Sequence, residues 1–141
     1  MQLTPIFAVY CNKYVITVDE ARDVFARRIA AWLAEDVDAY VDCWHDDMRI
    51  EMPTGVIEGS DRYRKLVVGS FAWAAPVSFD VHHLAVDGPN DIVFADWTIR
   101  ARRHEDDELV EWRGLSVCEL KEGRISWWRE HHLAPPGPVP D

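Results

Sequence analysis

The chain has 141 residues, with 15 Lys and Arg against 25 Asp and Glu, which gives a formal net charge of -10 at pH 7. This length fits one domain with room for an enclosed cavity. The acidic balance argues against nucleic acid or a membrane surface as partner, because both bind basic faces. We therefore expect a single domain over residues 1–141 that binds a neutral or weakly charged small molecule.

Cysteine content and hydropathy favour the cytoplasm. The cysteines are too few and too scattered for a disulfide framework or a zinc motif; they are Cys11, Cys43 and Cys118. The first 18 residues are fairly apolar but lack the basic start of a signal peptide. No run approaches the ~20 apolar residues of a membrane span. We treat 1–16 as an N-terminal arm and 134–141 as a proline-rich tail that cannot extend a sheet.

Helical patterns fill the first half of the chain. Thr17 or Asp19 can cap a helix of about sixteen residues, in which apolar side chains recur at helical spacing. These are Val24, Phe25, Ile29, Trp32 and Leu33. Asp36 can cap a second, short helix. After a strand over 48–52, a third helix begins near Gly59 and runs to about Trp73.

Strand patterns fill the second half, over 77–86, 92–103, 109–120 and 124–133, with turn residues between them. Helices first and strands second predict an α+β domain, in which the helices cover one face of a curved antiparallel sheet. On the strand over 92–103, alternation places Trp97 and Ile99 on an apolar, inward face.

The last strand carries the most informative residues. Alternation places Ser126, Trp128, Glu130 and His132 on one face, so that a carboxylate lies between an indole and an imidazole. Apolar surroundings raise a carboxyl pKa toward the range useful for proton transfer. Glu130 is therefore the first candidate for acid-base chemistry.

Pairing across the last hairpin gives this face its neighbours. If Leu120 pairs with Arg124, Gly114 lies opposite Glu130, Ser116 opposite Trp128, and Trp112 opposite His132. Gly114 then either bends the sheet or leaves room for a ligand atom. The three tryptophans either line a small-molecule pocket or fill the core; they are Trp97, Trp112 and Trp128.

Two further candidates have alternative interpretations. Glu51 shares an alternation class with Arg49, so it is either exposed and ion-paired or a second buried carboxylate. His82 and His83 are adjacent on a strand, so one of them faces the helices. An inward histidine is either a hydrogen-bonded core residue or a catalyst.

Two segments resemble the nuclear transport factor 2-like superfamily, which includes SnoaL-type polyketide cyclases, limonene epoxide hydrolase, scytalone dehydratase and ketosteroid isomerase. Residues 34–51 look like the family's passage from helix to first strand, and residues 120–130 look like its final hairpin. The resemblance implies a cone-shaped sheet around an apolar pocket. It is specific for fold and weak for reaction.

The resemblance also implies roles for individual residues. Glu130 matches an acidic catalytic position, and in the dehydratase branch an aspartate at the place of Asp36 orients a histidine at the place of His82. The epoxide hydrolases have an arginine and an aspartate where this chain has Trp97 and Ile99, so their complete machinery is absent. Ketosteroid isomerases have their base before a proline, where this chain has Met52.

The leading hypothesis is a cofactor-independent cyclase, isomerase or dehydratase for a hydrophobic, oxygenated molecule such as a polyketide or terpenoid. Its predicted catalytic residues are Glu130, His82 and Asp36, and its predicted substrate-binding residues are Trp97, Trp112, Ser116, Trp128, His132, Glu51, Ile99 and Gly114. The alternatives are a non-catalytic binding or assembly module, an epoxide hydrolase with altered machinery, and a metal site at Glu130, His132 and His82.

The opposite face of the last strand suits a partner. The resemblance implies a homodimer, because many members of the superfamily pair through the outer sheet face, and this face carries an aromatic and basic patch here. Its residues are Trp127, Arg129 and His131. Aromatic and Arg side chains are favoured in interface cores. We therefore expect a homodimer through the outer face.

Overall fold

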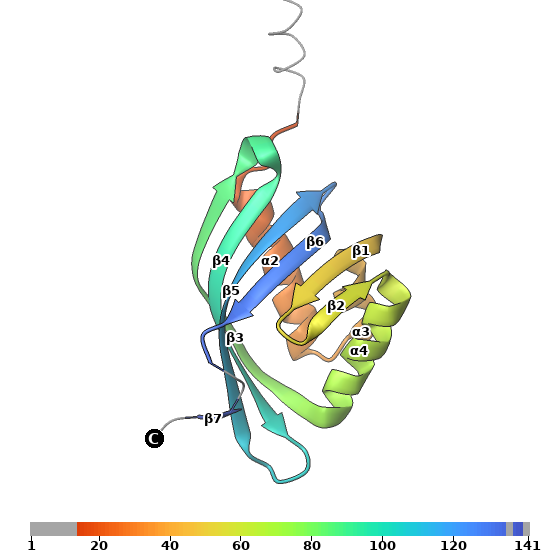
Figure 1. Cartoon of the computed structure of the whole chain (residues 1–141), viewed down its shortest axis with the longest axis vertical. Coiled ribbons are helices and arrows are strands. Elements are labelled where there is room, and N and C mark those ends of the chain that lie inside the picture. The colour runs from red at the N-terminus through yellow and green to blue at the C-terminus, as the bar shows by residue number, and fades with distance from the viewer. Residues whose placement is uncertain (1–13, 135–136, 140–141) are drawn as a thin grey trace, which may run out of the picture.

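The computed structural model describes residues 14–134 and 137–139 (Figure 1). Its helices are α2 (Val18–Leu33), α3 (Val37–Asp42) and α4 (Ser60–Trp73), with a 3-10 turn, η1 (Gly88–Asn90). Its strands are β1 (Trp44–Met52), β2 (Gly55–Glu58), β3 (Ala74–Asp87), β4 (Ile92–Arg103), β5 (Leu109–Lys121), β6 (Arg124–His132) and β7 (Gly137–Pro138). The predicted α+β class is confirmed. Most of the predicted N-terminal arm lies outside the described residues.

Local signals account for the helix boundaries. The Thr17 hydroxyl accepts a hydrogen bond from the Glu20 amide, and the Asp36 carboxylate accepts one from the Ala39 amide, so α2 and α3 both begin at a side-chain cap. One face of α2 is buried; it consists of Ala21, Val24, Phe25, Arg28 and Ala31. This spacing of three and four residues is typical of a helix that packs on a core.

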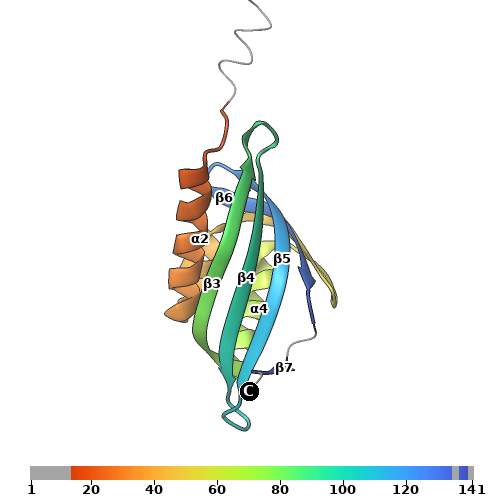
Figure 2. The same cartoon turned by 90° about the vertical axis from the view of Figure 1, so that its left-hand side faces the viewer.

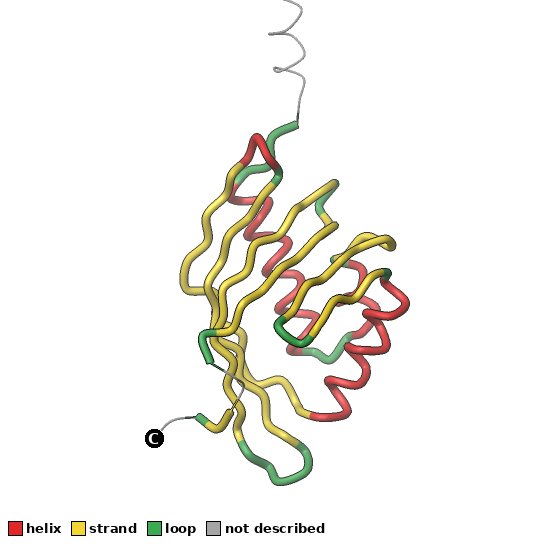
Figure 3. Tube along the Cα trace, viewed as in Figure 1, coloured by secondary structure: helices red, strands yellow, loops and turns green. Residues whose placement is uncertain are grey.

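The strands form one curved sheet in the order β2-β1-β6-β5-β4-β3, with β7 paired to β5 (Figure 3). Strands β3 to β6 form the predicted antiparallel meander. The pair β1 and β6 is parallel, which the prediction of an antiparallel sheet missed. These two strands are far apart in sequence, so no tight hairpin fixes their relative direction. Helix α4 connects β2 to β3, the two edge strands of this order.

The helices lie on the concave side of the sheet, with α2 running along β3 (Figure 2). Between these layers lies a core rich in aromatic rings, which includes Phe25, Trp44, Tyr63, Phe79 and Trp128. Among the described residues, no helix is both long and apolar enough to cross a membrane.

The register of the last hairpin differs from the prediction. The turn has two residues, Glu122 and Gly123, both with positive φ, and Lys121 rather than Leu120 pairs with Arg124. A bulge next to Glu119 then shifts the register again. As a result Ser116 pairs with Glu130, Gly114 pairs with His132, and Cys118 pairs with Trp128. The predicted partners of these residues were wrong by two positions.

The proline-rich tail also differs from the prediction, because part of it joins the sheet. Strand β7 pairs with the start of β5, where Pro138 lies opposite Val110. Proline cannot donate to a ladder, but the neighbouring Val139 amide donates to the Leu109 carbonyl at 3.1 Å. A single proline is therefore tolerated in this two-residue edge strand.

Candidate active site

A cavity of about 670 Å³, which we call the main cavity, opens between the helices and the inner face of the sheet. Aromatic and aliphatic side chains form most of its wall, with a few polar groups among them. The residues important here are Trp32, Tyr40, Phe79, Trp97, Ile99, Trp112, Glu130 and His132. An apolar cavity with a few convergent polar groups is typical of a small-molecule site.

Glu130 is held from two sides by its own strand. The indole N–H of Trp128 donates to one carboxylate oxygen at 3.0 Å, and Nε2 of His132 lies 2.6 Å from the other. Alternation along β6 brings the three side chains to one face, as the sequence predicts. The side chains of Glu130 and His132 are only 12% and 18% exposed. The carboxylate therefore has a fixed direction at the cavity wall.

Trp97 occupies the space that Gly114 provides. A Cβ on Gly114 would lie 2.5 Å from the Trp97 ring and 2.9 Å from the carbonyl oxygen of His131. The Trp97 indole N–H donates to the Ser116 hydroxyl at 3.1 Å. Gly114 and Ser116 therefore hold Trp97 in place, and neither lies on the main cavity as a substrate-binding residue would.

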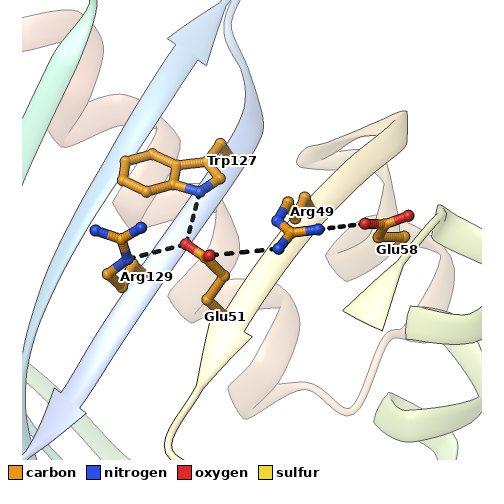
Figure 4. A network of polar contacts seen from close by, with 5 residues as sticks. All are labelled: Arg49, Glu51, Glu58, Trp127 and Arg129. Carbon is orange, nitrogen blue, oxygen red and sulfur yellow. Dashed lines mark hydrogen bonds and ion pairs between the residues drawn. The ribbon is translucent and has the colours of Figure 1, made fainter. Parts of the chain in front are cut away.

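Trp128 and Glu51 also differ from their predicted roles. Trp128 is fully buried in the core and reaches the site only through its N–H. Glu51 lies on the outer face of β1, where it accepts hydrogen bonds from Arg129 at 2.9 Å and Trp127 at 3.0 Å (Figure 4). Arg49 bridges Glu51 and Glu58. Of the two alternatives for Glu51, an ion-paired surface carboxylate and a buried one, the structure shows the ion-paired carboxylate, and it lies away from the main cavity.

The hydrogen bond from Arg129 lowers the pKa of Glu51 below its ordinary value, with Trp127 and Arg49 acting in the same direction. Arg129 also stacks on the Trp127 ring, 5.0 Å from its centre. These two residues, which we expected in a dimer surface, are therefore preorganised within the chain.

The structure does not bring Asp36, His82 and Glu130 together. Asp36 is exposed and caps α3 through the Ala39 amide. A bulge in β3 between Val81 and His83 leaves both histidines exposed. His82 contacts the Thr98 hydroxyl at 2.8 Å, and His83 contacts the Asp96 carboxylate at 3.0 Å. The predicted catalytic pair of Asp36 and His82 is not formed.

Metal binding by Glu130, His132 and His82 has no support in this geometry. His82 contacts Thr98 and does not line the main cavity, whereas Glu130 and His132 do. Within residues 14–134 and 137–139, no three His, Cys, Asp or Glu side chains are grouped to hold a metal ion.

Arg28 is the residue that the sequence interpretation missed. It is 5% exposed, and its Nε and Nη2 donate to the Tyr40 hydroxyl at 3.1 and 2.9 Å. Its guanidinium carbon lies 4.3 Å from the centre of the Trp128 ring. The burial of Arg28 could have been predicted from the sequence by helical spacing. Arg28 follows Val24 by four residues and precedes Ala31 by three, so it lies on the buried face of α2.

Arg28 lines a smaller space of about 150 Å³, which we call the inner chamber. Tyr63 lies beside Tyr40 there, with 3.1 Å between the two hydroxyl oxygens. Burial raises the pKa of Tyr63 well above its ordinary value, so its hydroxyl stays protonated. The inner chamber and the main cavity share six lining residues, namely Trp32, Tyr40, Met52, Leu66, Ser70 and Glu130. The two spaces are therefore adjacent.

The fold and this cavity define an α+β cone of the nuclear transport factor 2-like superfamily. The SnoaL-like domain family matches residues 25–128, and the chain belongs to that family. No match was found among curated proteins.

Solved structures support the same fold at low sequence identity. A provisionally assigned isomerase from Bacillus subtilis is 18% identical with a TM-score of 0.75, and the match covers 81% of this chain and 86% of that one. An LEH-like epoxide hydrolase from M. tuberculosis is 23% identical with a TM-score of 0.69, covering 81% and 83%.

A de novo designed protein with a curved β-sheet also matches, at 18% identity and a TM-score of 0.64, covering 85% of this chain and 89% of that one. The fold therefore carries no reaction by itself. The function depends on the residues at the cavity.

Proposed function

We propose that the protein is a cofactor-independent enzyme that moves protons on a hydrophobic, oxygenated small molecule, as a cyclase, isomerase or dehydratase of polyketide- or terpenoid-like compounds. Glu130 is the proposed acid-base residue. His132 and Trp128 position its carboxylate, and Trp97 and Trp112 form part of the apolar wall around the substrate.

The observation that carries this proposal is the setting of Glu130. Its carboxylate lies almost out of solvent, is directed by two donors, and borders an apolar cavity large enough for a multi-ring molecule. A carboxylate held in this way can remove a proton from a substrate and return it elsewhere on the same molecule. Exclusion of water by the aromatic wall protects the charged intermediate.

A generic substrate tests the role of Glu130 as a base even though the natural substrate is not identified. When a base removes the ring C–H proton of 5-nitrobenzisoxazole, its N–O bond breaks and the coloured product 2-cyano-4-nitrophenolate forms. We expect saturable elimination by the wild type and a decrease of about 10²-fold or more in Glu130→Gln, since general-base catalysis contributes on this order.

The matched control is Glu51→Gln, which removes a carboxylate from the outer face and leaves the cavity intact. It should eliminate the same compound at the wild-type rate. Equal rates in wild type and Glu130→Gln would refute the role of Glu130.

A binding module for hydrophobic ligands is the second candidate, and the predominantly apolar wall of the main cavity favours it. Such a module would bind an apolar ligand without turnover. In that case Trp112→Ala would weaken binding, while Glu130→Gln would leave it unchanged.

We further propose a homodimer through the outer sheet face. Phe94 and Leu115 are each 50% exposed on neighbouring strands of this face, and exposed apolar side chains that lie together are typical of an interaction surface. Sedimentation equilibrium should give twice the chain mass for the wild type. Leu115→Asp should give the mass of one chain if this face forms the interface.

A further inference from the structure

Arg28 is a buried cation without a direct ion pair, because the carboxylate of Glu130, which lines the same inner chamber, acts on it only through space. Within the described part of the chain, no carboxylate lies at ion-pair distance from it, and its hydrogen bonds go to the Tyr40 hydroxyl. Its Nη1 atom is fully buried and has no hydrogen-bond partner. Four aromatic rings lie within 6 Å of its guanidinium carbon, those of Tyr40, Trp44, Phe79 and Trp128, with Trp128 the closest at 4.3 Å.

This arrangement is costly unless something else completes it. A charge removed from water is destabilising without a partner of opposite charge, and a buried N–H without an acceptor adds to that cost. Ring faces offset only part of this, because cation–π attraction is weaker than a charge-assisted hydrogen bond. What Arg28 lacks is a direct hydrogen bond to an oxygen with negative charge.

The position of Arg28 shows where such an oxygen would come from. Arg28 lines the inner chamber, which shares Trp32, Tyr40 and Glu130 with the main cavity. A ligand whose apolar body fills the main cavity can therefore direct a small polar head into the inner chamber. A volume of about 150 Å³ accommodates a carboxylate or a ring oxygen with little else.

We propose that Arg28 and Tyr40 bind an anionic oxygen carried by an apolar ligand, such as a conjugated carboxylate, a phenolate or an enolate. If the ligand is the substrate, the proposal rests on the proposed function of Glu130. If the ligand only binds, the proposal does not depend on that function. Guanidinium suits this role because it stays charged and offers several donors in one plane.

Glu130 sets the electrostatic condition for such binding. Its carboxylate lines the same inner chamber, so it repels an anion that arrives already charged. If Glu130 takes the proton from a neutral substrate, negative charge moves from the carboxylate to the substrate oxygen and the total charge of the site stays constant. Arg28 then stabilises the charge that develops in the reaction.

The test compares two ligands of the same shape, 2-naphthoate and its neutral analogue 2-naphthamide, by calorimetry on the full chain at pH 7. We expect the wild type to bind 2-naphthoate at least tenfold more tightly. Arg28→Met should abolish this preference, and Arg28→Lys should retain part of it. Glu130→Gln should bind 2-naphthoate more tightly than the wild type, because the repelling charge is removed.

Arg27→Met is the matched control, since Arg27 is the neighbouring residue on α2 and its side chain contacts Asp23 and the Gly123 carbonyl at the surface. It should keep the wild-type preference. Equal affinity of the wild type for both ligands would overturn the inference, and this measurement needs no variant, so a misfolded Arg28→Met cannot obscure it.

The binding role of Arg28 and the catalytic role of Glu130 can fail independently. If Glu130→Gln stops the elimination of 5-nitrobenzisoxazole while the wild type shows no preference for 2-naphthoate, only the Arg28 inference fails. If Glu130→Gln eliminates at the wild-type rate while Arg28→Met loses the preference, the inference stands and the proposed reaction fails.

Discussion

Arg28 stacks on the face of Trp128, with 4.3 Å between the guanidinium carbon and the ring centre. The edge of the same indole donates its N–H to Glu130 at 3.0 Å. One core side chain therefore contacts both the buried cation and the candidate base. Any change in Trp128 should alter the position of both charged groups.

Trp128→Phe should lower both stability and activity. Phenylalanine keeps an aromatic face for Arg28 but removes the donor to Glu130 and leaves unfilled space. We expect a loss of about 2 kcal/mol in the free energy of unfolding, measured by urea denaturation. Elimination of 5-nitrobenzisoxazole should decrease about tenfold, because the carboxylate loses one of its two positioning groups.

Trp127→Phe is the control for this variant, because it removes the indole donor to Glu51 on the outer face. It should cost under about 1 kcal/mol and leave elimination unchanged. A similar decrease in activity for both variants would mean that the effect of Trp128 is a general loss of structure.

Gly114→Ala should destabilise the protein and displace Trp97. The new methyl group would lie 2.5 Å from the Trp97 ring and 2.9 Å from a backbone carbonyl, and the carbonyl cannot move without disturbing β6. Overpacking of this kind costs about 1–3 kcal/mol. Thermal unfolding measures the loss, and Trp97 fluorescence reports the displacement through comparison with a Trp97→Phe background.

Gly69→Ala is the matched control, since Gly69 lies in α4 and, apart from the adjacent backbone of its own helix, no atom lies within 4 Å of the added methyl group. Alanine in a helix interior is favoured over glycine by about 0.5–1 kcal/mol. The two glycine variants should therefore change stability in opposite directions.

Glu51→Gln should produce a pH-dependent loss of stability. The hydrogen bond from Arg129 lowers the pKa of Glu51 in the folded state, so the ionised carboxylate stabilises the fold above the ordinary pKa of 4.5. This contribution disappears as pH falls through the lowered pKa. Urea denaturation between pH 7 and pH 3 should show wild type and variant converging at the acid end.

Added salt provides a second check on this network, because screening weakens charge pairs near the surface. The difference between wild type and Glu51→Gln at pH 7 should decrease in 0.5 M NaCl, at roughly a 4 Å Debye length. A difference that is independent of both pH and salt would assign the effect to packing.

Cys118 should resist alkylation in the folded protein. Burial raises the pKa of its thiol to about 12, and burial also raises the pKa of the Cys43 thiol. At pH 8, iodoacetamide should leave both thiols unmodified in the native state and label both in guanidinium chloride. Peptide mass spectrometry distinguishes them from Cys11, and rapid native labelling of Cys118 would contradict its burial in the core.

The sequence determined those features that depend on neighbouring positions. Periodicity located α2, α4 and the four long strands, and the caps at Thr17 and Asp36 follow from side chains next to the first turn. Alternation along β6 placed Trp128, Glu130 and His132 on one face. Fixed backbone geometry relates residues two, three or four apart, so these relationships need no knowledge of the fold.

Only the tertiary structure decided how these segments meet. The two-residue turn at Glu122 and the bulge that follows set the register of the last hairpin, and the bulge at His82 turned both histidines outward. The parallel pairing of β1 with β6 and the burial of Arg28 against Trp128 join residues far apart in sequence. Such contacts depend on turn type and packing across the whole core, which a local pattern does not contain.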